Sequence, residues 1–212
     1  MFSMLRKCRA GAPGQEIFFA LFRQSCAAII AIFFIAGCSG GMHHKGQHQI
    51  GVSGSFGHAI KGETPWHDGD GRADNAGVAV DYHYFLEDRL AIGGAITPYR
   101  NYNLAGRDSA TGEFQLGVRY YIFEFDVLEK PVGLFAEVSG GILHGSRSVP
   151  EEGSHTNFTQ DNTLGLEWKL SDNISWQTGY RFRHLSNGYI FDSVNPAQND
   201  HQVFTGFAIS WN

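Results

Sequence analysis

A histidine and a serine two residues apart stand near the end of the chain, in the stretch "SWQTGYRFRHLSNGYI" (residues 175–190). Serine becomes a nucleophile when a base removes its proton, and histidine is the usual base. If this stretch is a strand, His184 and Ser186 project from one face with Cα atoms roughly 6.5–7 Å apart. A hydrogen bond between the two side chains is then feasible, and the pair could hydrolyse an ester.

The same alternating row carries large apolar side chains before it reaches His184. They are Ile174, Trp176, Tyr180 and Phe182. Such a row suits lipid, so a nucleophile at its end would meet a membrane lipid, which in a Gram-negative outer leaflet is lipopolysaccharide. The spacing therefore indicates an esterase or acyltransferase that acts on lipid A. A histidine beside aromatic residues is also common as a plain interface residue, so the spacing alone leaves both interpretations open.

Alternation of apolar and polar residues recurs in eight segments, which is the period of a strand with two different faces. The apolar rows begin at Ile50, Val78, Leu90, Phe114, Val132, Leu164, Ile174 and Val203. The opposite rows are small or polar and carry both signs of charge. A barrel with lipid outside and paired charges inside explains this pattern, so the sequence predicts an all-β fold, an eight-stranded antiparallel transmembrane β-barrel. A soluble lipocalin-like barrel, with the apolar row inside, is the alternative.

The predicted connections alternate between short and long, as in outer-membrane barrels with periplasmic turns and external loops. Residues 86–89 and 171–173 are tight turns, and 123–131 is an intermediate connection. The longer set covers about 61–74, 99–110, 145–160 and 187–200. This order places the end of the seventh strand, with His184 and Ser186, at the outer leaflet.

Charged residues on the inward rows predict a salt-bridged interior rather than a channel, because eight strands enclose too little space for one. They are Glu113, Arg119, Glu137, Glu167, Lys169, Arg181 and Arg183.

The N-terminus resembles a bacterial lipoprotein signal. Basic residues precede a short apolar stretch, "CAAIIAIFFIAG", which ends in "IAGC" (Ile35–Cys38). We expect residues 1–37 to be a signal peptide, Cys38 to be lipidated, 38–47 to be a flexible tether and 48–212 to be the barrel. Ordinary cleavage nearby is the alternative. Cys8 and Cys26 leave with the leader, so no structural disulfide is expected.

The composition argues against several classes of binding partner. The formal net charge is −5, and removal of a basic leader makes the remainder more acidic, which disfavours nucleic acid. The ten histidines match no zinc spacing, and "GDGRADN" (69–75) lacks the closing Glu of a calcium loop, so we expect no metal and no cofactor. The sequence is also compatible with a homodimer.

The stretch "RFRHLSNGYIFDSVNPAQND" resembles the C-terminal signature of lipid A 3-O-deacylases of the PagL type, over roughly residues 180–211. That family folds as an eight-stranded outer-membrane barrel and hydrolyses the ester at position 3 of lipid A with a lipid-facing Ser-His-Glu triad. The resemblance implies Ser186 as nucleophile, His184 as general base and Asn187 as oxyanion donor. Water would release a 3-hydroxy fatty acid.

The third triad position departs from the family pattern. Asn199 stands where the family has its acid, and a neutral amide can orient the imidazole but brings no charge. Parity also offers His201 on the outward row, and a bulge could turn Asp200 outward. Asp192, in the preceding loop, is a further alternative. The rival function is a non-enzymatic small barrel or surface lipoprotein with a structural or adhesive role.

Overall fold

The computed structural model describes residues 42–61, 72–104, 107–150, 153–190, 195 and 197–212. The expected leader, Cys38 and Asp192 lie outside the described residues. No helix in the described part of the chain is long and apolar enough to cross a membrane.

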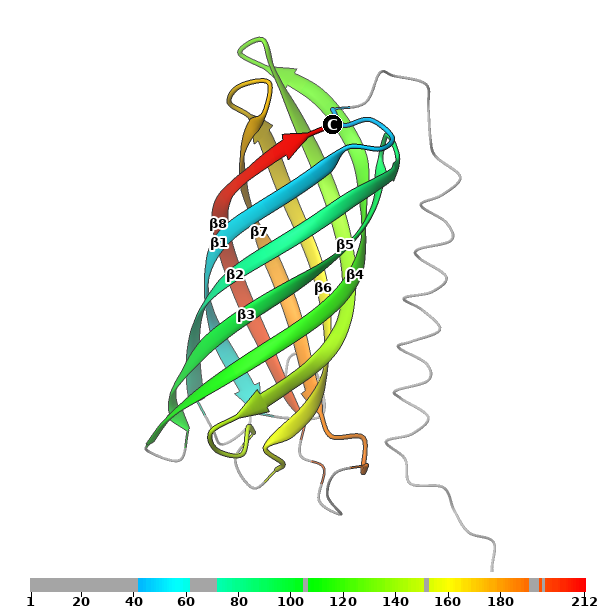
Figure 1. The fold of residues 1–212 in the computed structure, drawn as a ribbon. Coiled ribbons are helices and arrows are strands. Elements are labelled where there is room, and N and C mark those ends of the chain that lie inside the picture. Colours follow the sequence, from blue (N-terminus) through cyan, green and yellow to red (C-terminus); the bar gives the residue numbers. More distant parts are fainter. Residues whose placement is uncertain (1–41, 62–71, 105–106, 151–152, 191–194, 196) are drawn as a thin grey trace, which may run out of the picture. The chain divides into compact units, whose positions relative to one another are not determined.

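Eight antiparallel strands form a closed barrel in which each strand pairs with the next and β8 pairs with β1 (Figure 1). The strands are β1 (His48–Lys61), β2 (Arg72–Glu87), β3 (Leu90–Leu104), β4 (Arg107–Val127), β5 (Lys130–Gly145), β6 (Thr156–Lys169), β7 (Ile174–Ser186) and β8 (Gln198–Trp211). Closure leaves no unpaired sheet edge, which a bilayer would not tolerate. The predicted eight-stranded barrel is confirmed.

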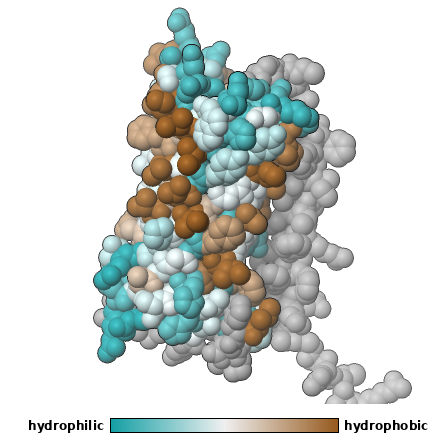
Figure 2. Space-filling model, viewed as in Figure 1, coloured by the Kyte–Doolittle hydropathy of each residue, from teal (hydrophilic) through white to brown (hydrophobic). Residues whose placement is uncertain are grey.

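The apolar rows face outward, as predicted. Val52 and Leu116 are 53% and 61% exposed, and apolar side chains gather in the middle of the wall between hydrophilic ends (Figure 2). Val132 differs from its row, since only 5% of it is exposed. Its cross-strand partners are Phe125 on β4 and Trp168 on β6. The outer surface therefore matches the bilayer core.

Three connections are shorter than the sequence indicated, among them the one expected over 145–160, because β6 already begins at Thr156. Strands β4 and β5 continue to Val127 and Lys130, so the expected connection over 123–131 is a two-residue hairpin of Leu128 and Glu129, whose φ angles of 52° and 61° suit a type I′ turn. Likewise, β3 and β4 extend through most of the loop expected over 99–110 and leave only 105–106 between them. Cross-strand pairing extends these hairpins beyond the apolar rows.

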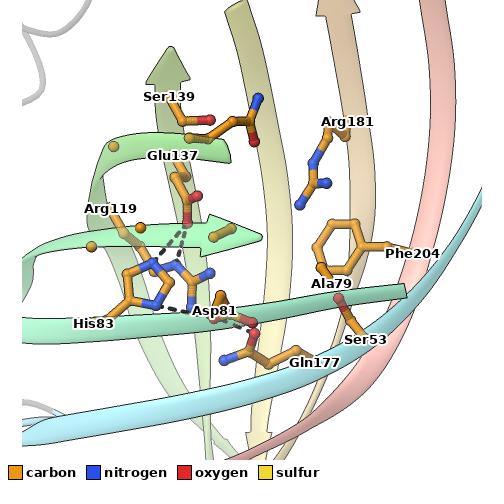
Figure 3. Close-up of a pocket in the computed structure, with 15 residues that line it drawn as sticks. Ser53, Ala79, Asp81, His83, Arg119, Glu137, Ser139, Gln177, Arg181 and Phe204 are labelled. Carbon is orange, nitrogen blue, oxygen red and sulfur yellow. Dashed lines mark hydrogen bonds and ion pairs between the residues drawn. The ribbon is translucent and has the colours of Figure 1, made fainter. Parts of the chain in front are cut away.

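The interior is filled by paired polar groups (Figure 3). Arg119 Nε donates to Glu137 Oε2 at 2.7 Å, and His83 Nε2 lies 3.3 Å from the same oxygen. Arg119 Nη1 also donates to Gln177 at 3.5 Å. These contacts confirm the predicted salt-bridged interior. Lys169 does not belong to it, because its ammonium reaches a carbonyl in the β6–β7 turn.

Residues 42–47 pack against the end of the barrel where β1 begins and β8 ends, instead of forming the flexible tether that was expected there. His43 is fully buried, with Nε2 3.2 Å from Glu167 Oε1 and its ring stacked on Phe85 at 4.2 Å. The N–H of Gly46 donates to the Phe85 carbonyl, and the Phe85 N–H donates to the carbonyl of Gln47. The segment therefore extends the β2 ladder and closes this end of the barrel.

Candidate active site

The outer end of β7 carries His184 and Ser186 on the outward face of the wall. Both side chains are half-buried, whereas Leu185 and Asn187 are 0% and 1% exposed. This end lies opposite the C-terminus of the chain, at the lower end of the barrel in Figure 1. The strand period thus brings His184 and Ser186 to one outward-facing surface beside the long loops.

His184 and Asn199 are cross-strand partners in the continuous pairing of β7 with β8. His184 Nδ1 lies 2.8 Å from Asn199 Oδ1, and Asn199 is only 2% exposed. The amide oxygen can only accept, so Nδ1 carries the proton and donates it. The remaining nitrogen, Nε2, then has its lone pair available to take a proton from a hydroxyl.

The structure separates the other candidates for the third position from His184. The β7–β8 ladder has no bulge, so Asp200 faces the interior, where Arg183 Nε donates to its Oδ2 at 2.8 Å. His201 faces outward, but its Nδ1 is hydrogen-bonded to the hydroxyl of Tyr180 and its ring meets Phe182 edge-on. Of the three, Asn199 is the residue that contacts His184.

No hydrogen bond joins Ser186 to His184 in the described part of the structure, although their side chains share a face. Ser186 pairs in register with Phe158 of β6. In unliganded enzymes catalytic hydrogen bonds are often long and shorten only when substrate binds. The observed arrangement therefore contains an oriented base and a nearby hydroxyl on the same surface.

Arg183 holds the ends of β7 and β8 together from inside the barrel. Its side chain is fully buried between Asp200 and Glu113, with Nη1 donating to Glu113 Oε2 at 3.0 Å. Its guanidinium also lies 4.1 Å from the centre of the Tyr99 ring. Because Arg183 pairs with Asp200 immediately beside the His184–Asn199 pair, it fixes the register on which that hydrogen bond depends.

We predict that Arg183→Met destabilises the barrel, because it leaves two buried carboxylates without their cation. Loss of one partner of such a cluster costs about 3–5 kcal/mol. The control is Arg100→Met, which removes an exposed pair with Asp108 worth less than about 1 kcal/mol. The free energy of unfolding of both variants is measured by urea titration in detergent micelles, with the change in gel mobility as the signal. Equal losses would contradict the role given to Arg183.

The loop after β7 is held by two asparagines. Asn187 Oδ1 accepts from the N–H of Tyr189 at 2.8 Å, and Asn195 Oδ1 accepts from the N–H groups of Asn187 and Gly188 at 2.7 and 3.2 Å. Gly188 and Tyr189 have φ near +60°, a conformation that these side-chain contacts stabilise. Asn195 was not singled out from the sequence, although the Asn-Pro dipeptide is a turn signal.

The sequence model of the lipid A 3-O-deacylase (PagL) family matches residues 74–208. The chain belongs to this family. The match runs from β2 to β8 and includes His184, Ser186 and Asn199. Among curated protein sequences, none matches the chain.

Solved structures agree with this family's fold. Neisserial surface protein A has a TM-score of 0.58 and 16% identity, covering 78% of this chain and 99% of its own. The outer membrane enzyme PagL has a TM-score of 0.51 and 19% identity, covering 73% and 97%. The PagL-family chain is therefore a bacterial outer-membrane barrel, and PagL proteins act on lipid A in that membrane.

Two outward residues of the PagL-family barrel, Gln160 and Asn162, were not predicted from the sequence to lie near the site. Gln160 and Asn162 continue the outward row of β6 beyond Leu164, and both are half-buried. Parity could have revealed them, since the row reads polar where neighbouring rows are apolar. The described residues contain no group of three or more His, Cys, Asp or Glu side chains arranged to hold a metal ion.

Proposed function

We propose that the protein hydrolyses the acyl ester at position 3 of lipid A, with Ser186 as nucleophile and His184 as general base. The observation that carries the proposal is the hydrogen bond from His184 Nδ1 to the buried Asn199, on the lipid-facing side and next to Ser186. It leaves Nε2 of His184 as the basic nitrogen. Family membership supports lipid A as the substrate, and the name of the family supports the 3-O position.

The reaction proceeds through an acyl-enzyme. His184 Nε2 takes the proton of Ser186 as its oxygen attacks the ester carbonyl, and the resulting imidazolium returns this proton to the departing sugar oxygen. Water, deprotonated by the same nitrogen, then attacks the acyl-enzyme and releases a 3-hydroxy fatty acid and Ser186. Asn199 holds the ring in the required tautomer but provides no charge to stabilise the imidazolium.

Asn187 is the proposed oxyanion donor, through its side-chain nitrogen Nδ2. Its Oδ1 accepts from the N–H of Tyr189, and its backbone N–H donates to Asn195 Oδ1. The side chain is 1% exposed. Donation from Nδ2 to the tetrahedral intermediate therefore requires the loop to adjust as the substrate enters.

Lipid A profiling tests this function. Lipid A from Gram-negative cells that express the folded protein should lose the mass of one ester-linked 3-hydroxyacyl chain, and the free 3-hydroxy acid should appear. Fragmentation of the product should locate the loss at position 3. Unchanged lipid A in cells whose outer membrane contains the folded barrel would favour a non-enzymatic barrel instead.

We also propose that residues 1–37 are a cleaved signal peptide and that Cys38 is lipidated. We predict that wild-type protein incorporates labelled palmitate and that Cys38→Ser does not, because only a thiol at this position is modified. The barrel should still assemble, since residues 42–212 contain all its strands. Cys8→Ser is the matched control and should retain the label. An unlabelled wild-type protein would contradict the proposed anchor.

A further inference from the structure

Two carboxamides lie on the outer wall of the barrel directly beside the proposed catalytic row. In the β6–β7 pairing Gln160 stands opposite His184, and Asn162 stands opposite Phe182. Their outward direction follows from the period of β6, in which Thr159, Asp161 and Thr163 are buried. Leu164 and Leu166 continue the same outward row toward the periplasmic end and are 50% and 39% exposed.

Neither carboxamide has a hydrogen-bond partner among the described residues. Other polar side chains of the outer wall are satisfied within the protein: Thr178 donates to the Phe204 carbonyl at 2.9 Å, and Thr205 accepts from the indole N–H of Trp176 at 2.9 Å. An amide that faces hydrocarbon without a hydrogen-bond partner is strongly unfavourable. Gln160 and Asn162 therefore need a polar partner that comes from the membrane.

The direction of the strands identifies that partner. Ser186 is at the outer end of β7, so an acyl chain whose ester carbonyl meets Ser186 extends toward the bilayer centre. On that path the chain passes first the cross-strand pair His184–Gln160 and then the cross-strand pair Phe182–Asn162. Amide and phosphate groups of lipid A lie at or above the depth of the ester. The polar group below the ester is the hydroxyl at the third carbon of the acyl chain.

We propose that Gln160 and Asn162 bind this hydroxyl and make the enzyme selective for 3-hydroxyacyl esters. A hydroxyl offers one donor and two acceptor positions, and a carboxamide offers both kinds of group in return. Two carboxamides at positions i and i+2 can therefore engage one hydroxyl from the same face. The inference rests on the proposed function, since it assigns the substrate class of that same site.

The test compares two synthetic lipid A-type substrates in mixed micelles, one with a 3-hydroxyacyl chain and one with an unhydroxylated chain of equal length at position 3. The variants are Gln160→Met and Asn162→Leu, which keep the side-chain size and place apolar groups in lipid. Thr178→Val is the control, because it removes an outward hydroxyl that is satisfied within the protein. The measured quantity is kcat/KM for each substrate.

We expect the wild-type enzyme to prefer the hydroxylated substrate roughly tenfold or more, because each hydrogen bond to the hydroxyl contributes a factor of a few to about ten. Gln160→Met and Asn162→Leu should lose most of this preference while cleaving the unhydroxylated substrate at least as well as the wild type. Thr178→Val should keep the preference. Cleavage of both substrates with an unchanged ratio in the variants would overturn this inference alone. A wild-type barrel that cleaves neither substrate would overturn the proposed function and this inference with it.

Discussion

Ser186→Ala should abolish lipid A deacylation while leaving the barrel folded. The hydroxyl forms the acyl-enzyme, and in serine hydrolases removal of the nucleophile or of its base lowers kcat by about 10⁶. His184→Ala should therefore lower the rate to a similar extent, and the double variant should be little worse than either single variant, because the two residues act as a unit. Release of the free 3-hydroxy acid from purified lipid A measures all three.

Ser171→Ala is the matched control for Ser186→Ala. Ser171 lies in the turn between β6 and β7, at the other end of the same hairpin, where its hydroxyl accepts from the N–H of Ile174 at 3.2 Å. The Ser171→Ala variant should deacylate lipid A at the wild-type rate. Activity that survives in folded Ser186→Ala would remove this residue from the mechanism.

Asn199→Asp should accelerate the enzyme. Asp is isosteric with Asn, so the acceptor stays 2.8 Å from His184 Nδ1 and gains the charge that stabilises the imidazolium. In a serine protease the reverse change, from Asp to Asn, lowers turnover by about 10⁴ because the Asn leaves the histidine in the wrong tautomer, whereas Asn199 already accepts from Nδ1, so only the effect of the charge applies here. We expect a gain of roughly tenfold or more, limited by the low exposure of the site, which raises the cost of a carboxylate. Asn199→Glu should gain less, because its extra methylene displaces the carboxylate.

Two further variants separate charge from orientation. Asn199→Leu removes the acceptor that keeps the proton on Nδ1 of His184. The imidazole is then no longer held in one tautomer, and the rate should fall below that of the wild type. Asn173→Asp adds a charge in the periplasmic β6–β7 turn and should change nothing. Single-turnover rates on purified lipid A distinguish these outcomes. If Asn199→Asp and Asn199→Leu both kept the wild-type rate, the third member of the triad would lie elsewhere, with Asp192 as the next residue to test.

The outer wall of the barrel could be predicted because lipid imposes a simple rule on the chain. Each spanning strand must alternate between an apolar outward row and a polar inward row, as Leu116 and Gln115 do, so direction follows from parity. His184 and Ser186 share the parity of Phe182, and the motif around them predicted both the family and the place where chemistry could occur. The connections were misjudged, because cross-strand pairing extended β3, β4 and β5 beyond the apolar rows, and so was the segment 42–47, which packs on the barrel instead of forming a flexible tether.

Neighbours across strands could not be predicted, because parity leaves the register of each strand pair open. The choice between Asn199 and Asp200 depended on the absence of a bulge in the β7–β8 ladder, which brought Asn199 to His184 and Asp200 to Arg183. The same kind of register placed Gln160 opposite His184. The candidates for a site follow from the parity of residues along each strand. Which of these candidates touch is decided by hydrogen-bonded pairing between strands, and this pairing exists only in the closed barrel.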